Sequence, residues 1–285
     1  MAVPPLTYAF QPKEKIKEGF LRILGEIAQQ GEDLAEFSSG PMEEPIHDGR
    51  LMIKRLRGLL WFARPSLSGE VIAQTKTALR DAAGLLGGHR DLAVAQATLK
   101  KLRKNASTSA ERKALAETSQ QLSKDPEATE MTEDKLRLSL KKAMDIVCRS
   151  VLALKQNVAH RNSWASPSRR LAKARQAQIK AGKKARRSGD DTDFHTWRKR
   201  AKLLFYQMEL TQSVGGKKLI RAMKKVEELQ ARLGEYHDDV MVEGRLAKAG
   251  APSHSAKRIL KSLDREKTDL RRKATKIARR IKVKL

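Results

Sequence analysis

Histidine, arginine and lysine recur three or four positions apart between residues 47 and 61 of the chain. At about 100° per residue, an α-helix over this segment would gather them on one strip of its surface. We call this the first basic strip, and its members are His47, Arg50, Lys54, Arg57 and Trp61. Arginine can donate two hydrogen bonds at once to phosphate oxygens, and lysine supplies a mobile positive charge. The strip therefore has the chemistry of a phosphate-binding surface.

The helix that would carry this strip also has an apolar side, and the pattern recurs later in the chain. The opposite side carries Met52, Ile53, Leu56, Leu59 and Leu60. A second basic strip repeats the offsets of the first after 148 positions, with the members His195, Arg198 and Lys202. Leu-Gly-Gly-His-Arg-Asp at 86–91 is matched after 147 positions by Leu-Gly-Glu-Tyr-His-Asp at 233–238. Two matches at nearly one offset predict an internal duplication.

The charge of the chain indicates an anionic partner. Its 285 residues include sixty Lys plus Arg against thirty-three Asp plus Glu, which gives a net charge of +27. Such an excess destabilises a compact state by self-repulsion, and a partner with many negative charges would relieve it. Nucleic acid, an anionic membrane and inorganic polyphosphate all have this property.

Several absences favour a cytoplasmic protein. Cys148 is the only cysteine, so no intramolecular disulfide can form, which suits a reducing compartment. The N-terminus lacks the charged and apolar regions of a signal peptide, and no apolar run approaches the ~18 residues of a membrane span. We therefore expect no association with a membrane.

The elements that must position the strips are expected to be helices throughout, because no stretch alternates with the period of a β-strand. Periodicity and breaking residues predict them at 14–37, 45–64, 68–104, 110–122, 133–158, 168–187, 192–213, 216–248 and 253–282. Gly87 and Gly88 fall inside the third range and predict either a kink or a close helix approach. We predict an all-α fold in which residues 1–160 and 161–285 each form a four-helix bundle.

These motifs resemble those of the CHAD family, the conserved histidine α-helical domain, along nearly the whole chain. The resemblance rests on the segments 47–57, 86–91, 195–206 and 233–238. It implies two pseudo-twofold-related bundles around a basic groove or pore, non-catalytic binding of long-chain inorganic polyphosphate, and targeting to polyphosphate granules. The polyphosphate-binding residues that it implies are His47, Arg50, Lys54, Arg55, Arg57, Arg90, His195, Arg198, Lys199, Lys202 and His237.

The chain also departs from this pattern in its second half. His237 stands where the first half has Arg90, and Leu203 and Phe205 replace the cations at 55 and 57. We therefore expect the second strip to be the weaker one. The Glu-x-Glu-x-Lys motif of the triphosphate-tunnel module that often accompanies the domain does not occur, so the chain resembles the binding domain alone.

A metal-dependent phosphohydrolase is one alternative, because His47 precedes Asp48 and His237 precedes Asp238. The surrounding arginines and lysines would repel a divalent cation, so we expect no metal, no cofactor and no catalytic residue. The histidines could instead donate to phosphate, since imidazole gains a proton beside an anion, or to a backbone carbonyl.

A protein that binds RNA or DNA is the second alternative, since any phosphate chain would satisfy the same charge. Aromatic residues make up only 4% of the chain, which is too few to build a platform for stacked bases. Geometry separates the two partners. A narrow channel between facing strips favours polyphosphate, whereas a flat basic face favours nucleic acid.

Overall fold

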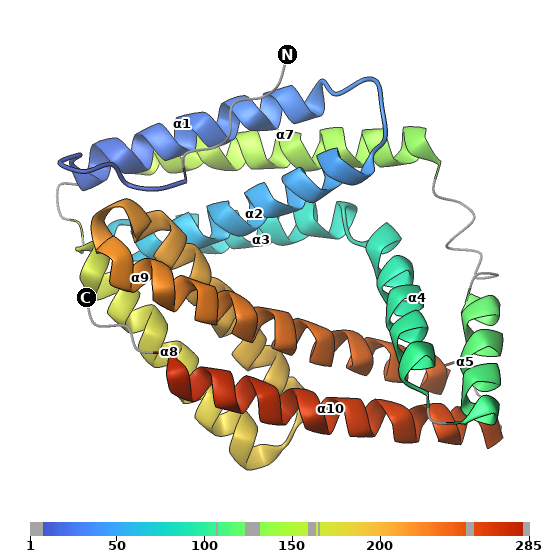
Figure 1. Cartoon of the computed structure of the whole chain (residues 1–285). Helices are drawn as coiled ribbons and strands as arrows, with labels where there is room; N and C mark the ends of the chain where they lie inside the picture. The colour runs from blue at the N-terminus through green and yellow to red at the C-terminus, as the bar shows by residue number, and fades with distance from the viewer. Residues whose placement is uncertain are drawn as a thin grey trace.

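The computed structural model describes residues 8–106, 108–122, 132–158, 164, 166–248 and 254–281, with side chains except at 88–93, 121–122, 247–248 and 254–256. Within these ranges every regular element is a helix (Figure 1). The helices are α1 Ile16–Ala35, α2 Glu43–Ala63, α3 Gly69–Leu85, α4 Gly88–Asn105, α5 Ser109–Leu122, α7 Glu133–Val158, α8 Pro167–Ser188, α9 Asp191–Lys248 and α10 His254–Arg280. A 3-10 turn, Arg64–Ser66, follows α2 where the sequence places Pro65.

The predicted helix over 68–104 is wrong as a single element. It divides into α3 and α4 at Leu86 and Gly87, where the amide of Gly87 donates to the carbonyl of Gly84 in a turn. The predicted separation at Gly215-Gly216 is confirmed, because Gly216 has φ 66° and interrupts α9. An L side chain rarely adopts such a φ, which explains glycine at this bend. We call residues 191–215 and 217–248 the first and second arms of α9.

Helices α1, α2, α3 and α7 share one hydrophobic core. Their apolar faces meet around fully buried side chains such as Phe20, Leu56, Leu79 and Val147. α7 lies alongside α1 although nearly a hundred residues separate them in the sequence (Figure 1). Each helix buries one stripe of its surface and leaves the opposite stripe to polar residues, as expected of an amphipathic helix.

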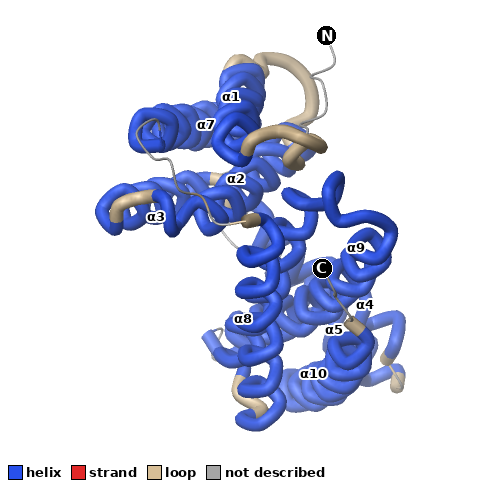
Figure 2. The backbone as a smooth tube through the Cα atoms, turned by 90° about the vertical axis from the view of Figure 1, so that its left-hand side faces the viewer, coloured by secondary structure: helices blue, strands red, loops and turns tan. Residues whose placement is uncertain are grey.

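Helices α8 and α10 pack with both arms of α9 around a second core. Trp197 is its largest fully buried side chain, and Phe194, Leu229 and Leu270 surround it in the same cluster. A close approach of α8 accommodates the indole, because a Cβ added to Gly182 would lie 2.7 Å from Trp197 Cε2. In Figure 2 this second group lies below the first.

α4 and α5 belong to the first 160 residues but pack against α9 and α10. Leu99 of α4 and Leu115 of α5 share a third cluster with Val242, Ile259 and Leu263. The break before α4 turns the chain away from the first core toward these helices (Figure 1). The two halves of the sequence are therefore interleaved in space through α4 and α5.

A direct contact between α2 and the first arm of α9 joins the two larger cores. Gln207 Nε2 of α9 donates to the carbonyl of Gly58 of α2 over 2.6 Å, and Tyr8, from the segment before α1, donates its Oη hydrogen to the carbonyl of Arg55 over 2.6 Å. A Cβ at Gly58 would lie 2.9 Å from Tyr206 Cβ, so the helices nearly touch. No helix in the described ranges is long and apolar enough to cross a bilayer.

Candidate functional site: a basic pocket between α2, α3 and α9

The first basic strip lies on α2, opposite the face that enters the first core. His47 and Arg57 are exposed, and Arg50, Lys54 and Trp61 are half-buried. Arg50 Nη1 donates to the carbonyl of Leu86 over 2.6 Å, at the end of α3. Carbonyls at a helix C-terminus lack intrahelical donors and carry partial negative charge, so they hold a guanidinium well.

Arg57 is anchored in a similar way further along α3. Its Nη2 donates to the carbonyl of Leu79 over 2.8 Å, although the residue as a whole is exposed. Burial of part of its guanidinium lowers the pKa of Arg57. Two arginines of the strip on α2 are therefore held by the backbone of α3.

Arg55, a predicted binding residue next to Lys54 of the first strip, has a different environment from the strip. It pairs with Glu209 of α9 over 2.5 Å, and only 20% and 14% of the two side chains are exposed. The ion pair neutralises Arg55 within the contact between α2 and α9. The pair joins the two helices, and Arg55 is not among the described residues that line the pocket between α2, α3 and α9.

The predicted residues of the second half come together at the second strip. The rings of His195 and His237 lie 4.7 Å apart between centroids, at an interplanar angle of 34°. Burial, followed by the charges of Lys199, Arg198 and Lys202, lowers the pKa of His195. Burial and then the same three cations, together with His195, lower the pKa of His237 to about 4. Both imidazoles are therefore neutral at pH 7.

A pocket of about 530 Å³ opens between the helices that carry the two strips. Its cations come from α2, the turn after it, α3 and the first arm of α9, and they are Arg57, Arg64, Lys76, Lys199 and Arg200. Leu60, Trp61, Ile72 and Leu203 form apolar walls, with the polar Thr196 beside them. None of these described lining residues is acidic. Arg57 of the first strip and Lys199, a predicted binding residue next to Arg198 of the second strip, thus line the same pocket.

Three of the pocket cations were missed by the sequence reasoning. Arg64 lies two helical turns beyond Arg57, so extending the first strip by seven residues would have found it. Arg200 lies beside the second strip, but only its tertiary position shows that it reaches the pocket. Lys76 had no sequence signal at all, because it comes from the neighbouring helix α3.

A buried arginine supports the wall of this pocket from α8. Arg170 is 5% exposed, its guanidinium lies 3.9 Å from the centroid of the Trp61 ring, and it also donates to the carbonyl of Trp61. Burial, followed by repulsion from Arg64, lowers the pKa of Arg170 to about 10, so it stays charged at pH 7. The cation–π contact fixes the indole and adds positive charge behind the wall.

Two further predictions concern Arg90 and a metal site. The side chain of Arg90 lies outside the described side chains, and only its backbone is placed, in the first turn of α4. Among the described residues, no three His, Cys, Asp or Glu side chains group in a way that could hold a metal ion. The pocket offers hydrogen-bond donors and positive charge, and this chemistry binds anions.

The comparisons with known proteins agree with this architecture. The model of the CHAD domain family matches residues 24–247. The crystal structure of the CHAD domain from the plant Ricinus communis is similar to this chain, with a TM-score of 0.61 at 17% identity, covering 92% of this chain and 87% of that one. At this identity the likeness shows the fold. No curated protein matches the chain. Because the family model spans most of its length, the protein belongs to the CHAD domain family.

Proposed function

We propose that this protein binds long-chain inorganic polyphosphate without catalysing its turnover. The observation that carries the proposal is the pocket between α2, α3 and α9, whose described lining includes five cations and no carboxylate. Uncompensated charges that face one another in a partly buried site repel, and a multivalent anion removes that repulsion. Membership of the CHAD family, which is known in general terms to bind polyphosphate, supports the same ligand.

The shape of the site favours polyphosphate over nucleic acid. A pocket of about 530 Å³ admits a thin, flexible chain but not a duplex, whose major groove alone is about 12 Å wide. A single strand would need exposed aromatic faces on which its bases could stack. Trp61 is the aromatic residue in the described lining, and Arg170 already covers one face of its ring.

The proposal includes the predicted duplication of the chain. α2 and the first arm of α9 carry the two matching strips, and they contact each other beside the pocket. This meeting of equivalent helices supports two pseudo-twofold-related halves that share one basic groove. A polyphosphate chain would then extend from Arg57 and Lys199 along both strips. Cytoplasmic localisation, including polyphosphate granules, belongs to the same proposal.

The decisive experiment compares affinities for long-chain polyphosphate and RNA at equal phosphate concentration. The pocket variant carries Lys199→Glu and Arg200→Glu, both on exposed positions of the first arm of α9. The matched control carries Lys217→Glu and Lys218→Glu, which are also adjacent, exposed and on α9 but do not line the pocket. Both variants change the net charge equally.

We expect the pocket variant to lose affinity for polyphosphate by about tenfold or more, since each charged hydrogen bond contributes roughly 1.5–3 kcal/mol. The control should lose much less. An equal loss in both variants would mean that diffuse charge rather than the pocket binds the polymer. Tighter binding of RNA than of polyphosphate by the wild type would favour the nucleic-acid alternative.

A further inference from the structure

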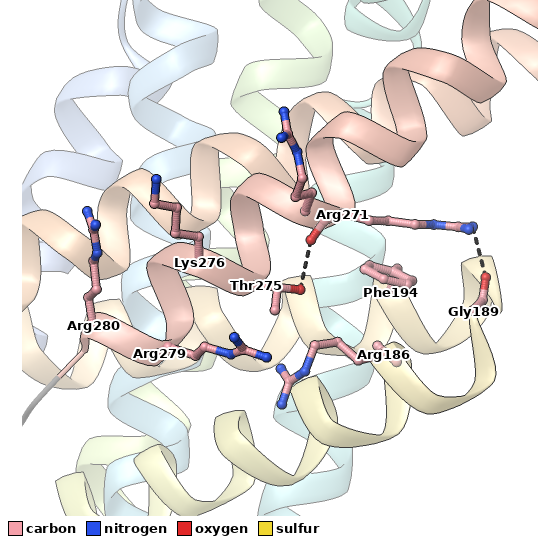
Figure 3. Close-up of a pocket in the computed structure, with 10 residues that line it drawn as sticks. Arg186, Gly189, Phe194, Arg271, Thr275, Lys276, Arg279 and Arg280 are labelled. Atoms are coloured by element: carbon pink, nitrogen blue, oxygen red, sulfur yellow. Dashed lines mark hydrogen bonds between the residues drawn. The ribbon is translucent and has the colours of Figure 1, made fainter.

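A second basic pocket, of about 720 Å³, lies between the C-terminal parts of α8 and α10 (Figure 3). It is formed by different helices from the pocket described above, apart from α9, which contributes Phe194. Its cations come from α8 and α10, and they are Arg186, Arg271, Arg272, Lys276, Arg279 and Arg280. No acidic side chain is among its described lining residues.

Two of these cations already have partners within the protein. Arg271 donates to the carbonyl of Gly189 over 2.8 Å and to Tyr236 Oη over 2.6 Å, and it also pairs with Asp191. Arg272 pairs with Asp269 over 2.7 Å. Both charges are therefore already paired with a carboxylate of the protein.

Arg186 and Arg279 are arranged differently. Figure 3 shows the two guanidinium groups pointing toward each other, one from α8 and one from α10. Neither has an acidic partner among the described residues, although the Arg186 guanidinium also lies 5.6 Å from the centroid of the Trp197 ring. Burial, followed by the charge of Arg279, lowers the pKa of Arg186. A basic residue in the last turn of a helix is favoured by the helix dipole, but the dipole does not explain why two guanidinium groups converge.

We propose that Arg186 and Arg279 form a second anion site, which takes a short phosphoanhydride anion such as pyrophosphate or tripolyphosphate. Each guanidinium can donate two parallel hydrogen bonds to one phosphoryl group, so a chain of two or three phosphates would separate the two positive charges. The volume of the pocket falls within the range of small-ligand sites.

The walls of the pocket select an inorganic anion over a nucleotide. Phe194 is the aromatic residue of the described lining, but it is 2% exposed, and its ring lies 4.7 Å from that of Tyr236. A nucleobase would find no open aromatic face there. Thr275 donates its hydroxyl hydrogen to the carbonyl of Arg271, so this group stabilises α10 and does not face the anion (Figure 3).

The test measures tripolyphosphate binding by calorimetric titration to wild type, Arg186→Gln and Arg279→Gln. Arg272→Gln is the matched control, because it removes an arginine from the same pocket that already pairs with Asp269. We expect each of the first two variants to bind at least about tenfold more weakly than wild type, and the control to stay within about twofold. Unchanged affinity in Arg186→Gln and Arg279→Gln, or an equal loss in the control, would overturn the proposal.

Thermal melts without ligand verify that the variants fold. Arg279→Gln should melt no lower than wild type, because it removes a repulsion, and tripolyphosphate should raise the melting temperature of wild type more than that of the variant. An equal rise in both proteins would contradict the site.

A further experiment distinguishes this site from the proposed polyphosphate groove. The variant with Lys199→Glu and Arg200→Glu should keep its affinity for tripolyphosphate, and loss of that binding would overturn a separate site. In the same background, long-chain polyphosphate is compared with tripolyphosphate at equal concentrations of chain ends. Affinities that agree would support a site for free short anions and chain ends alike. Affinity that follows the total phosphate concentration would overturn it. If the proposed groove did not bind polyphosphate, these measurements would still test the second site.

Discussion

The two basic strips share a sequence pattern but not an electrostatic state. On α2, Arg50 and Arg57 donate to backbone carbonyls of α3, so the fold itself satisfies part of their hydrogen-bonding capacity. On α9, burial and then the neighbouring cations lower the pKa of both His195 and His237, so the paired imidazoles are neutral at pH 7. The difference is that α2 holds Arg50 and Arg57 against the backbone of α3, whereas the neutral imidazoles on α9 would take up protons beside a bound anion.

The largest expected effect is a difference in stability between two variants, one on each strip helix, that both lose affinity for polyphosphate. Arg50→Glu should weaken polyphosphate binding and also lower the free energy of unfolding by about 1.5–3 kcal/mol, because it loses a charged hydrogen bond and places a carboxylate beside the carbonyl of Leu86. Lys199→Glu, at an exposed position, should weaken binding with little change in stability. Urea unfolding and polyphosphate titration measure the two quantities. Equal stability of both variants would show that the strips are alike.

The contact between the two strip helices provides the next effect. Gly58→Ala on α2 would place a methyl group 2.7 Å from Tyr8 Oη and 2.9 Å from Tyr206 Cβ. We expect a loss of about 1–3 kcal/mol in unfolding free energy through overpacking. The control is Gly234→Ala on α9, where a Cβ would meet no atom within 4 Å and helix propensity should stabilise the protein by up to ~1 kcal/mol. A neutral Gly58→Ala in thermal or urea unfolding would mean that the helices can move apart freely.

The histidine pair predicts a dependence on pH that only the α9 strip should produce. The pKa of His237 is about 4 in the folded protein, below its ordinary value of 6.5. Burial raises the pKa of Asp239 to about 7, which acts in the opposite direction over the same range. The unfolded chain binds a proton at His237 first, so the contribution of His237 to folding stability is lost as the pH falls from about 6.5 to about 4. A bound polyanion would raise this pKa, so binding should tighten over the same fall in pH, with uptake of protons.

Calorimetric titration in buffers of different ionisation enthalpy measures this uptake directly. His237→Gln should bind with less proton uptake and a flatter pH profile than wild type. His47→Gln is the matched control on α2, where the imidazole is exposed. If both substitutions change the uptake equally, the contrast between the strips is wrong.

The smallest expected effect concerns salt. Polyphosphate binding should weaken as the salt concentration rises, because the polyanion releases condensed counterions when cations neutralise it. Arg57→Gln and Lys199→Gln should each make this dependence slightly shallower, since each removes one pocket cation. Affinity measured over a series of salt concentrations tests the prediction. An affinity of the wild type that does not change with salt would exclude electrostatic binding on either strip.

The sequence by itself determined which segments form helices and which face each helix buries. The predicted segment 133–158 coincides with α7, and the apolar side of the first strip helix enters the first core as expected. Both properties depend on local propensity and on the 3.6-residue period, which are written in consecutive residues. The motifs that they position were also sufficient to identify the family.

Tertiary structure decided how the helices meet, and with it the composition of the candidate site. Glycine at 87 weakened the helix locally, but the direction of α4 depends on its packing against α5 and α9. Arg55 pairs with Glu209, 154 positions away, while Lys76 reaches the pocket and Arg186 meets Arg279. Periodicity reports the face on which a side chain lies but not the surface that this face meets. A charge is paired or left facing another charge only when distant helices come together.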